Sequence, residues 1–382
     1  MSSVENLRKK LIGNIDLSKD ISDEELQEEI SELVIKELKG QKVSLKQKMN
    51  VSKELFDSIR GLDILQKILE DGEITEIMVN GWENIFVERK GKLCRYDGSF
   101  ASKEKLQDVV QIIASRSNKR VNEASPILDT RLSDGSRVNI VLPPVSVGGA
   151  TITIRKFPET AITMETLIKM KSISKEAADF LKEQVFERKN IFISGGTGSG
   201  KTTFLNVLSN FIPKDERIIT IEDSAELQIN GVENLVSLEC RQANVEGDNE
   251  VTIRDLIRTS LRMRPDRIIV GEVRGAEALD MLQAMNTGHE GSLSTGHANS
   301  PADMLTRLET MVLMGTEMPV SAIRSQIASA LDLMIHLERM RDGSRKVVEI
   351  SRVLGLSEEK IWIRPVFRYD RNKKELIRQE EK

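Results

Sequence analysis

Eight residues in the middle of the chain constrain its fold more than any other feature. The apolar run 190–194 before them predicts a buried strand, and 203–211 after them predicts a helix. A glycine-rich turn between a strand and a helix brings successive backbone N–H groups to the positive end of the helix, where phosphate oxygens bind. The turn matches G-x-x-x-x-G-K-[ST] and is followed by Thr203; it reads Gly195-Gly196-Thr197-Gly198-Ser199-Gly200-Lys201-Thr202.

This segment predicts that the chain binds a nucleoside triphosphate through its phosphates. The glycines allow close approach of the backbone, Lys201 adds a mobile positive charge, and Thr202 offers its hydroxyl to Mg²⁺. A flexible Gly/Ser turn is the alternative interpretation. The lysine, the threonine and both flanking elements weigh against it.

Composition sets the class of protein. A chain of 382 residues predicts two or three domains, and a net charge of −4 argues against a stable nucleic acid partner. Cys94 and Cys240 form no C-x-x-C pattern, which indicates a reducing compartment and no zinc site. The N-terminus lacks a signal-peptide core, and nowhere do 18 apolar residues run together. We therefore expect a cytoplasmic protein, free to dock on a membrane complex.

Residues 1–60 are highly charged and predict a helical lobe that packs or binds a partner. The clearest helix begins at a Ser22 cap, with Glu25 three residues later and Ile21 placed to pack on Leu26, and it ends at Gly40. Its apolar stripe consists of Leu26, Ile30, Leu33 and Leu38.

Two further domains follow. Residues 61–157 predict a small α+β domain, with helices over 62–69 and 102–115 and strands over 76–79, 85–89, 92–96, 137–142 and 151–157. Residues 158–187 predict a helical connector. Over 188–382, strands and helices alternate to about residue 350, which predicts an α/β domain with a mainly parallel sheet. The last segment adds strand candidates over 346–353 and 361–369 and a charged tail.

Carboxylates follow two of the apolar strands, where the carboxyl end of a parallel strand faces the ligand. Glu222 and Asp223 close the first, and Glu272 follows the second, over 268–270, where it would orient attacking water. For a single acid after a strand, a cap on the next loop is the alternative. Gly271 stands where many phosphate-loop enzymes carry a Mg²⁺-binding Asp. The metal would then rely on Thr202, phosphate oxygens, water and Glu222 or Asp223.

Two of the three histidines, His289 and His297, lie in a Gly/Ser/Thr-rich segment over 287–300. Metal binding is one interpretation, but the spacing matches no metal-site pattern. A polar sensor of the γ-phosphate or of metal-bound water fits the segment better. His336, alone in an apolar run, is predicted to be an ordinary strand or core residue.

The ordered set of phosphate loop, Ile221-Glu222-Asp223, Ile268-Ile-Val-Gly-Glu272 and two-histidine segment resembles the secretion ATPase superfamily, the hexameric motors of type II and type IV secretion and of type IV pili. The resemblance covers about residues 60–350. Further segments are similar to the CpaF/TadA branch of tight-adherence (Flp) pili, which is close to the VirB11-type ATPases; they include Leu132-Ser-Asp-Gly-Ser-Arg137-Val-Asn, Thr153-Ile-Arg155-Lys-Phe157 and Thr252-Ile-Arg254-Asp-Leu256.

The resemblance implies a RecA-like ATPase domain preceded by a PAS-like domain, with ATP and Mg²⁺ as cofactors. It assigns phosphate and Mg²⁺ binding to Gly195 through Thr203, acid-box and metal duty to Glu222, and general-base duty to Glu272. It also implies catalytic roles for Lys201, His289 and His297, and charge-neutralising roles for Arg131, Arg137 and Arg155 from the smaller domain. Surface solvation is the alternative for any one arginine.

The partners that the resemblance implies are further copies of the chain, as a hexamer, and a pilus or secretion platform protein of the inner membrane. The motor would therefore lie at the cytoplasmic face of that membrane. Two alternatives stay open: a VirB11-type ATPase of DNA transfer, and a nucleotide-binding scaffold that does not hydrolyse ATP.

Overall fold

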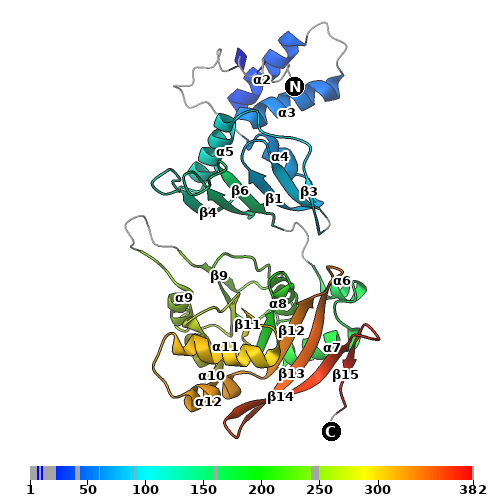
Figure 1. The fold of residues 1–382 in the computed structure, drawn as a ribbon, viewed down its shortest axis with the longest axis vertical. Coiled ribbons are helices and arrows are strands. Elements are labelled where there is room, and N and C mark those ends of the chain that lie inside the picture. Colours follow the sequence, from blue (N-terminus) through cyan, green and yellow to red (C-terminus); the bar gives the residue numbers. More distant parts are fainter. Residues whose placement is uncertain are drawn as a thin grey trace. The chain divides into compact units, whose positions relative to one another are not determined.

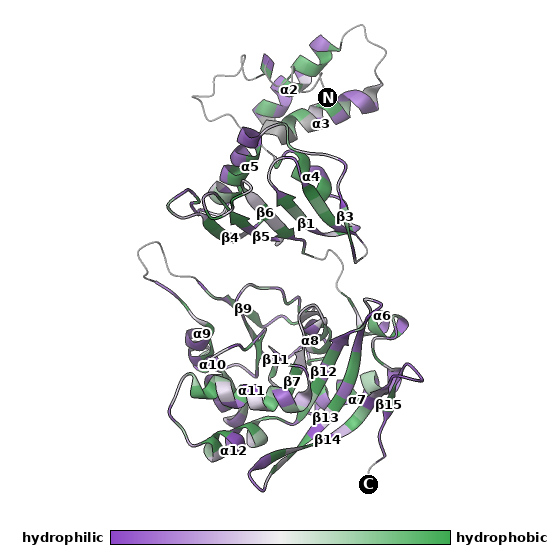
Figure 2. Ribbon diagram, in the orientation of Figure 1, coloured by the Kyte–Doolittle hydropathy of each residue, from purple (hydrophilic) through white to green (hydrophobic). Residues whose placement is uncertain are grey.

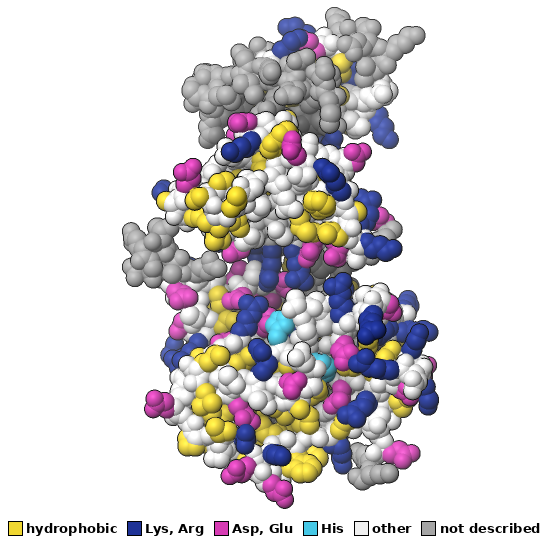
Figure 3. Space-filling view, in the orientation of Figure 1, with side chains coloured by type: hydrophobic (Ala, Val, Ile, Leu, Met, Phe, Trp, Pro, Cys, Tyr) yellow, Lys and Arg dark blue, Asp and Glu magenta, His cyan; other side chains and the backbone are white. Residues whose placement is uncertain are grey.

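The chain divides into two compact units, Met1–Glu159 and Thr160–Lys382 (Figure 1). The computed structural model describes residues 7, 10–11, 23–38, 44–59, 61–89, 91–157, 162–241 and 249–380. Within these residues no helix is both long and apolar enough to cross a membrane. Cys94 and Cys240 are free thiols, one in each unit. Acidic and basic side chains are interspersed over the face of the molecule shown in Figure 3.

The first unit begins with α2 (Asp23–Glu37) and α3 (Leu45–Ile59). The predicted apolar stripe is buried in a small cluster with Leu55, and each member is at most 9% exposed: Leu26, Ile30, Leu33 and Leu38. The predicted cap at Ser22, the packing residue Ile21 and the stop at Gly40 lie outside the described residues.

An antiparallel six-stranded sheet, in the order β3-β2-β1-β6-β5-β4, follows in the first unit. Its inward residues, such as Ile77, Ile152 and Ile154, pack with α4 and α5 in one core. Sequence reasoning missed β4, because only Ile127 and Leu128 in that strand are apolar. The elements are α4 (Ile64–Leu69), β1 (Ile74–Asn80), β2 (Ile85–Arg89), β3 (Lys92–Arg95), α5 (Lys103–Arg116), β4 (Ile127–Arg131), β5 (Arg137–Val141) and β6 (Thr151–Arg155).

The second unit contains a nine-stranded sheet in the order β15-β14-β13-β12-β7-β11-β10-β8-β9. Along this sheet order, each pair of neighbours from β12 through β7, β11, β10 and β8 to β9 is parallel, and the pairs among β12, β13, β14 and β15 are antiparallel. The predicted α/β class with a mainly parallel sheet is therefore confirmed. The strands are β7 (Ile191–Gly195), β8 (Ile218–Glu222), β9 (Leu235–Glu239), β10 (Arg267–Val270), β11 (Leu293–His297), β12 (Leu333–Arg339), β13 (Arg345–Ser357), β14 (Lys360–Asp370) and β15 (Glu375–Arg378).

Seven helices of the described chain pack on the two faces of this sheet, over apolar strands (Figure 2). Ile191 and Ile193 of β7 face one hydrophobic cluster, and Phe192 between them faces the other. The segment over 158–187, predicted as a connector, is instead part of this unit from α6 on, because Leu167 and Leu181 are buried in its core. The helices are α6 (Met164–Lys169), α7 (Lys175–Phe186), α8 (Lys201–Ser209), α9 (Ile253–Ser260), α10 (Glu277–Asn286), α11 (Pro301–Leu313) and α12 (Val320–Ala330).

A buried ion pair stands at the amino-terminal edge of the parallel strands. Arg267 is 0% exposed and donates to both carboxylate oxygens of Glu216, at 2.6 and 2.9 Å. Its third nitrogen donates to the carbonyl of Val185 at 2.7 Å. A Cβ on Gly291 would come within 2.7 Å of that guanidinium, so this position must stay glycine. The pair ties β10 to α7 and to the turn before β11.

Removing one partner of this pair leaves a buried charge. We expect Arg267→Met to lower the free energy of unfolding by about 3–5 kcal/mol, because Glu216 would then be desolvated without its main partner. The double variant Arg267→Met/Glu216→Leu is the matched control and should recover most of the loss. The urea midpoint of each variant measures the effect; equal midpoints for single and double variants would contradict it.

Candidate functional site

The phosphate-loop sequence lies between β7 and α8, at the carboxyl edge of the parallel strands. Gly198 and Gly200 have φ of 70° and 94°, the left-handed region that glycine tolerates best, and Gly200 forms the N-cap of α8. The helix begins at Lys201, two residues before its predicted start. Thr202 and Thr203 therefore belong to its first turn, whose N–H groups have no partner within the helix.

Neighbouring strands fix the base of the loop. Gly195 is aligned with His297 of β11 and with Leu337 of β12. A Cβ at Gly195 would stand 2.5 Å from the carbonyl oxygen of Leu337 and 2.6 Å from the hydroxyl of Ser199, so only glycine fits. By contrast, a Cβ on Gly196 would meet nothing within 4 Å, which leaves that side of the loop open.

Lys201 folds back over the loop. Its side chain is only 7% exposed, and Nζ donates to the carbonyl of Gly196 at 3.1 Å and lies 3.3 Å from Nδ1 of His297. Burial lowers the pKa of Lys201, Glu272 opposes this shift, and Arg274 adds to it. The ammonium thus stands inside the loop, where a phosphate would replace the Gly196 carbonyl as its partner.

Glu272 follows β10 at the same edge. Its Oε2 accepts a hydrogen bond from Arg274 at 2.9 Å, and its Oε1 lies 2.9 Å from Nε2 of His297. The Oε1–Nε2 contact is not aligned as a hydrogen bond. Within the described residues, Oε1 of Glu272 is therefore buried without a hydrogen-bond partner. Ser199 Oγ is a second such buried atom in this site. Both orphaned atoms suit a ligand or water.

Sequence reasoning gave no role to Arg274, which bridges two acids of the site. Besides Glu272, its guanidinium donates to Asp223 at 3.1 Å, and its own backbone N–H donates to Glu277 at 2.6 Å. The neighbouring carboxylates raise the pKa of Arg274, with the Glu272 hydrogen bond as the main cause. The pattern Glu-x-Arg directly after a buried strand is the signal that could have indicated this contact.

Glu222 behaves as the loop-capping alternative describes. It is 3% exposed, and its Oε1 accepts backbone hydrogen bonds from Glu226 at 2.8 Å and Leu227 at 3.2 Å. A Cβ on Gly271 would lie 2.9 Å from Cγ of Glu222. Gly271 is therefore small because Glu222 occupies the space that an aspartate there would need. The metal role of Glu222 stays a prediction.

The two predicted sensor histidines separate. His297 ends β11 beside Lys201, whereas His289 precedes β11 and lies at the amino edge of the sheet with Arg267 and Glu216. A strand of five residues spans about 13 Å, so the two imidazoles of one chain do not form one box. The prediction that His289 joins this site is corrected. Burial lowers the pKa of His297, Lys201 adds to that shift, and Glu272 opposes it.

The predicted arginines belong to the first unit and stand in one row. Arg137 pairs across the sheet with Arg131 on one side and with Arg155 on the other. Directly opposed residues in antiparallel strands point to the same face, so three cationic side chains share one face of β4, β5 and β6. Their predicted role toward a triphosphate stays a prediction.

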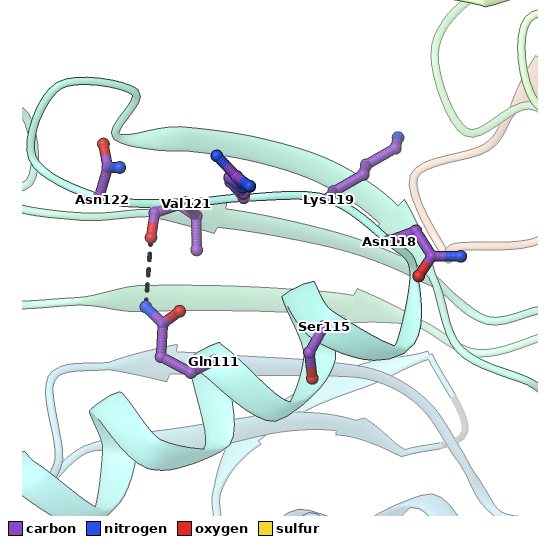
Figure 4. A pocket seen from close by; sticks show the side chains of 7 residues that line it. Gln111, Ser115, Asn118, Lys119, Val121 and Asn122 are labelled. Carbon is purple, nitrogen blue, oxygen red and sulfur yellow. Dashed lines mark hydrogen bonds between the residues drawn. The ribbon is translucent and has the colours of Figure 1, made fainter.

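Two other features lie outside the site. His336 is confirmed as a buried strand residue; its Nδ1 lies 2.9 Å from the hydroxyl of Ser194. A pocket of about 580 Å³ in the first unit lies between α5 and the loop after it (Figure 4). Its lining contains none of the predicted site residues; it consists of Gln111, Ser115, Asn118, Lys119, Arg120, Val121 and Asn122.

Comparisons with known proteins match most of this chain to one protein family. Residues 59–366 match the family described as "Type II/IV secretion system protein". A putative conjugal transfer protein of Mycobacterium tuberculosis is 36% identical over 323 residues, which is 83% of this chain and 91% of that protein. The type IV secretion system protein VirB11 of Brucella suis is 33% identical over 318 residues, covering 76% of this chain and 88% of VirB11.

The fold has a solved counterpart as well. The structure of the ATPase DotB from Legionella pneumophila superposes with a TM-score of 0.54 at 24% identity, covering 77% of this chain and 80% of DotB. The range matched by the family, residues 59–366, contains the positions of the loop, Glu272 and His297. The chain belongs to the type II/IV secretion system protein family, the secretion ATPase superfamily.

Proposed function

We propose that this chain hydrolyses ATP and works as a motor of a secretion or pilus-assembly machine. One observation carries the proposal: the imidazole of His297 lies between Lys201 of the loop, 3.3 Å from Nδ1, and the orphaned carboxylate oxygen of Glu272, 2.9 Å from Nε2. A phosphate loop needs such an acid to orient the attacking water. The family membership supports the same reaction.

The residues have distinct roles in this proposal. Backbone N–H groups from Gly196 to Thr203 bind the phosphates, and Lys201 leaves the Gly196 carbonyl for a phosphate oxygen. Glu272 orients water and accepts its proton, while Arg274 holds the other carboxylate oxygen. His297 lies against both groups, with Nδ1 3.3 Å from Nζ of Lys201 and Nε2 2.9 Å from Oε1 of Glu272.

The loop also fits Mg²⁺ bound with the nucleotide. Thr202 stands in the first turn of α8, and Ser199 offers a buried hydroxyl without a hydrogen-bond partner in the described chain. Thr202 would hold the ion, with Glu222 or Asp223 contributing through water. When bound, the metal neutralises charge on the phosphates.

Two kinds of machine are candidates for the one that this motor serves. The quoted motifs favour a CpaF/TadA-type motor for Flp pili, docked on a platform protein at the cytoplasmic face of the inner membrane. Relatives named as conjugal transfer and type IV secretion proteins favour the second candidate, a VirB11-type ATPase. Neighbouring genes for pilins and a pilus platform would support the first, and conjugation genes the second.

Replacing the proposed base should separate binding from chemistry. We expect Glu272→Gln to lower kcat by at least about 100-fold while ATP affinity stays within a few-fold, since the amide cannot accept the proton. Phosphate release and titration with a fluorescent ATP analogue measure the two effects. Glu290→Gln, at the opposite edge of the sheet, is the control and should keep wild-type activity.

Normal turnover by Glu272→Gln would contradict the role of this acid. A wild-type chain that binds ATP but releases no phosphate, with or without its platform protein, would instead support the scaffold alternative.

The state of His297 predicts a pH dependence. Because burial and Lys201 lower its pKa, His297 is neutral at pH 7 and gains charge only as pH falls below its ordinary value of about 6.5. The new charge would repel Lys201 and neutralise Glu272, so kcat/KM should fall on the acid side. His297→Gln should remove this part of the pH profile, and an unchanged profile would refute the assignment.

Ring assembly is the last part of the proposal. In analytical ultracentrifugation with a non-hydrolysable ATP analogue and Mg²⁺, we expect a species of six times the monomer mass. Lys201→Ala is the control, because it should lose the nucleotide and with it the ligand-dependent assembly. A monomer under all conditions would count against the ring.

A further inference from the structure

The hairpin of β12 and β13 brings arginines to the outer side of the phosphate loop. Arg345, the first residue of β13, donates from Nε to the carbonyl oxygen of Gly198 at 3.0 Å, across 147 residues of sequence. Its stem also covers the next glycine, since a Cβ on Gly200 would meet Cδ of Arg345 at 3.3 Å. Arg339, its cross-strand partner, has Nη1 3.7 Å from the corresponding point at Gly198.

The two glycines under this hairpin are those with left-handed φ. Such residues gain the most freedom when nothing holds them, so the loop would populate other conformations without an outer support. Arg345 engages the loop through the carbonyl of Gly198. A cation hydrogen-bonded to a loop carbonyl holds that peptide group in place. The neighbouring N–H groups of the loop, which would bind phosphate, are then held in place as well.

The base of Arg345 is itself anchored. Lys346, the next residue, donates to the carbonyls of Met170 and Lys171 at 3.2 and 2.7 Å, and Val347 N–H donates to Ser172 at 2.9 Å. On the other strand, Leu337 pairs with Gly195 at the start of the loop. The hairpin is therefore tied to the α6–α7 turn and to β7 on either side of its contact with the loop.

We propose that Arg345 is a positioning residue for nucleotide binding: it holds the phosphate loop in its binding conformation through the Gly198 carbonyl. This inference rests on the proposed function and names a residue outside the phosphate loop and its acids. Because the loop binds phosphates that ADP and ATP share, loss of Arg345 lowers the affinity for both nucleotides by the same factor. The apparent affinity is the intrinsic affinity multiplied by the fraction of chains whose loop is in the competent conformation, so it falls as that fraction falls.

The test compares Arg345→Ala with Arg341→Ala in the full-length protein. Arg341 is an exposed arginine of the same hairpin turn for which no hydrogen bond or ion pair is found in the described part of the chain. We expect Arg345→Ala to raise the Kd of both Mg-ADP and Mg-ATP about tenfold, with kcat unchanged, which is about 1.4 kcal/mol of binding free energy. Arg341→Ala should match wild type, and Arg345→Lys should recover part of the affinity.

Three outcomes would overturn the proposal. One is equal nucleotide affinity for Arg345→Ala and Arg341→Ala. Another is a fall in kcat at unchanged Kd, since that would make Arg345 a group that acts on the transition state. The third is a Kd effect on ATP but not on ADP, which would indicate contact with the γ-phosphate. If wild type itself binds no nucleotide, the proposed function fails before this inference is reached.

Discussion

The pairing of β7 with its two parallel neighbours is the constraint on which the site depends. This register places Gly195, His297 and Leu337 side by side at one edge of the sheet, where β7 and β11 end. Because parallel strands all present their carboxyl ends at the same edge, the loop after β7, the acid after β10 and the histidine ending β11 meet without any further device. Shifting β11 by one residue would turn His297 to the other face of the sheet.

The opposite edge holds the framework. Asn190, just before β7, accepts backbone hydrogen bonds from Gly291 and Ser292 and donates to Ala330, all while 4% exposed. Arg267 and Glu216 form their buried pair at the same edge. The amino edge of the sheet is thus held by buried hydrogen bonds, and the carboxyl edge carries the orphaned oxygens of Ser199 and Glu272.

Local pattern could predict most of the elements, with β4 as an exception, but not their contacts. The loop and Glu272 were found because each follows an apolar strand, a signal contained in a few residues. Arg345 could not be found, since its partner Gly198 is 147 positions away and β13 looks like any charged strand. Glu222 was ambiguous for a related reason: a carboxylate after a strand either binds a ligand or caps the next loop, and only the contacts to residues 226 and 227 show which backbone groups it engages. His289 lies close to His297 in sequence, but most of strand β11 separates the two residues in space, so sequence spacing alone gave the wrong place for His289.

The central claim is that the carboxyl edge of this sheet binds Mg-ATP through the loop while Glu272 faces the attacking water. A crystal structure of the protein with Mg²⁺ and a non-hydrolysable ATP analogue tests it most directly. The account predicts β- and γ-phosphates on the N–H groups of the loop, Lys201 moved from the Gly196 carbonyl to a phosphate oxygen, and an ordered water on Glu272. A nucleotide bound elsewhere, or Lys201 still on Gly196 beside a filled site, would contradict it.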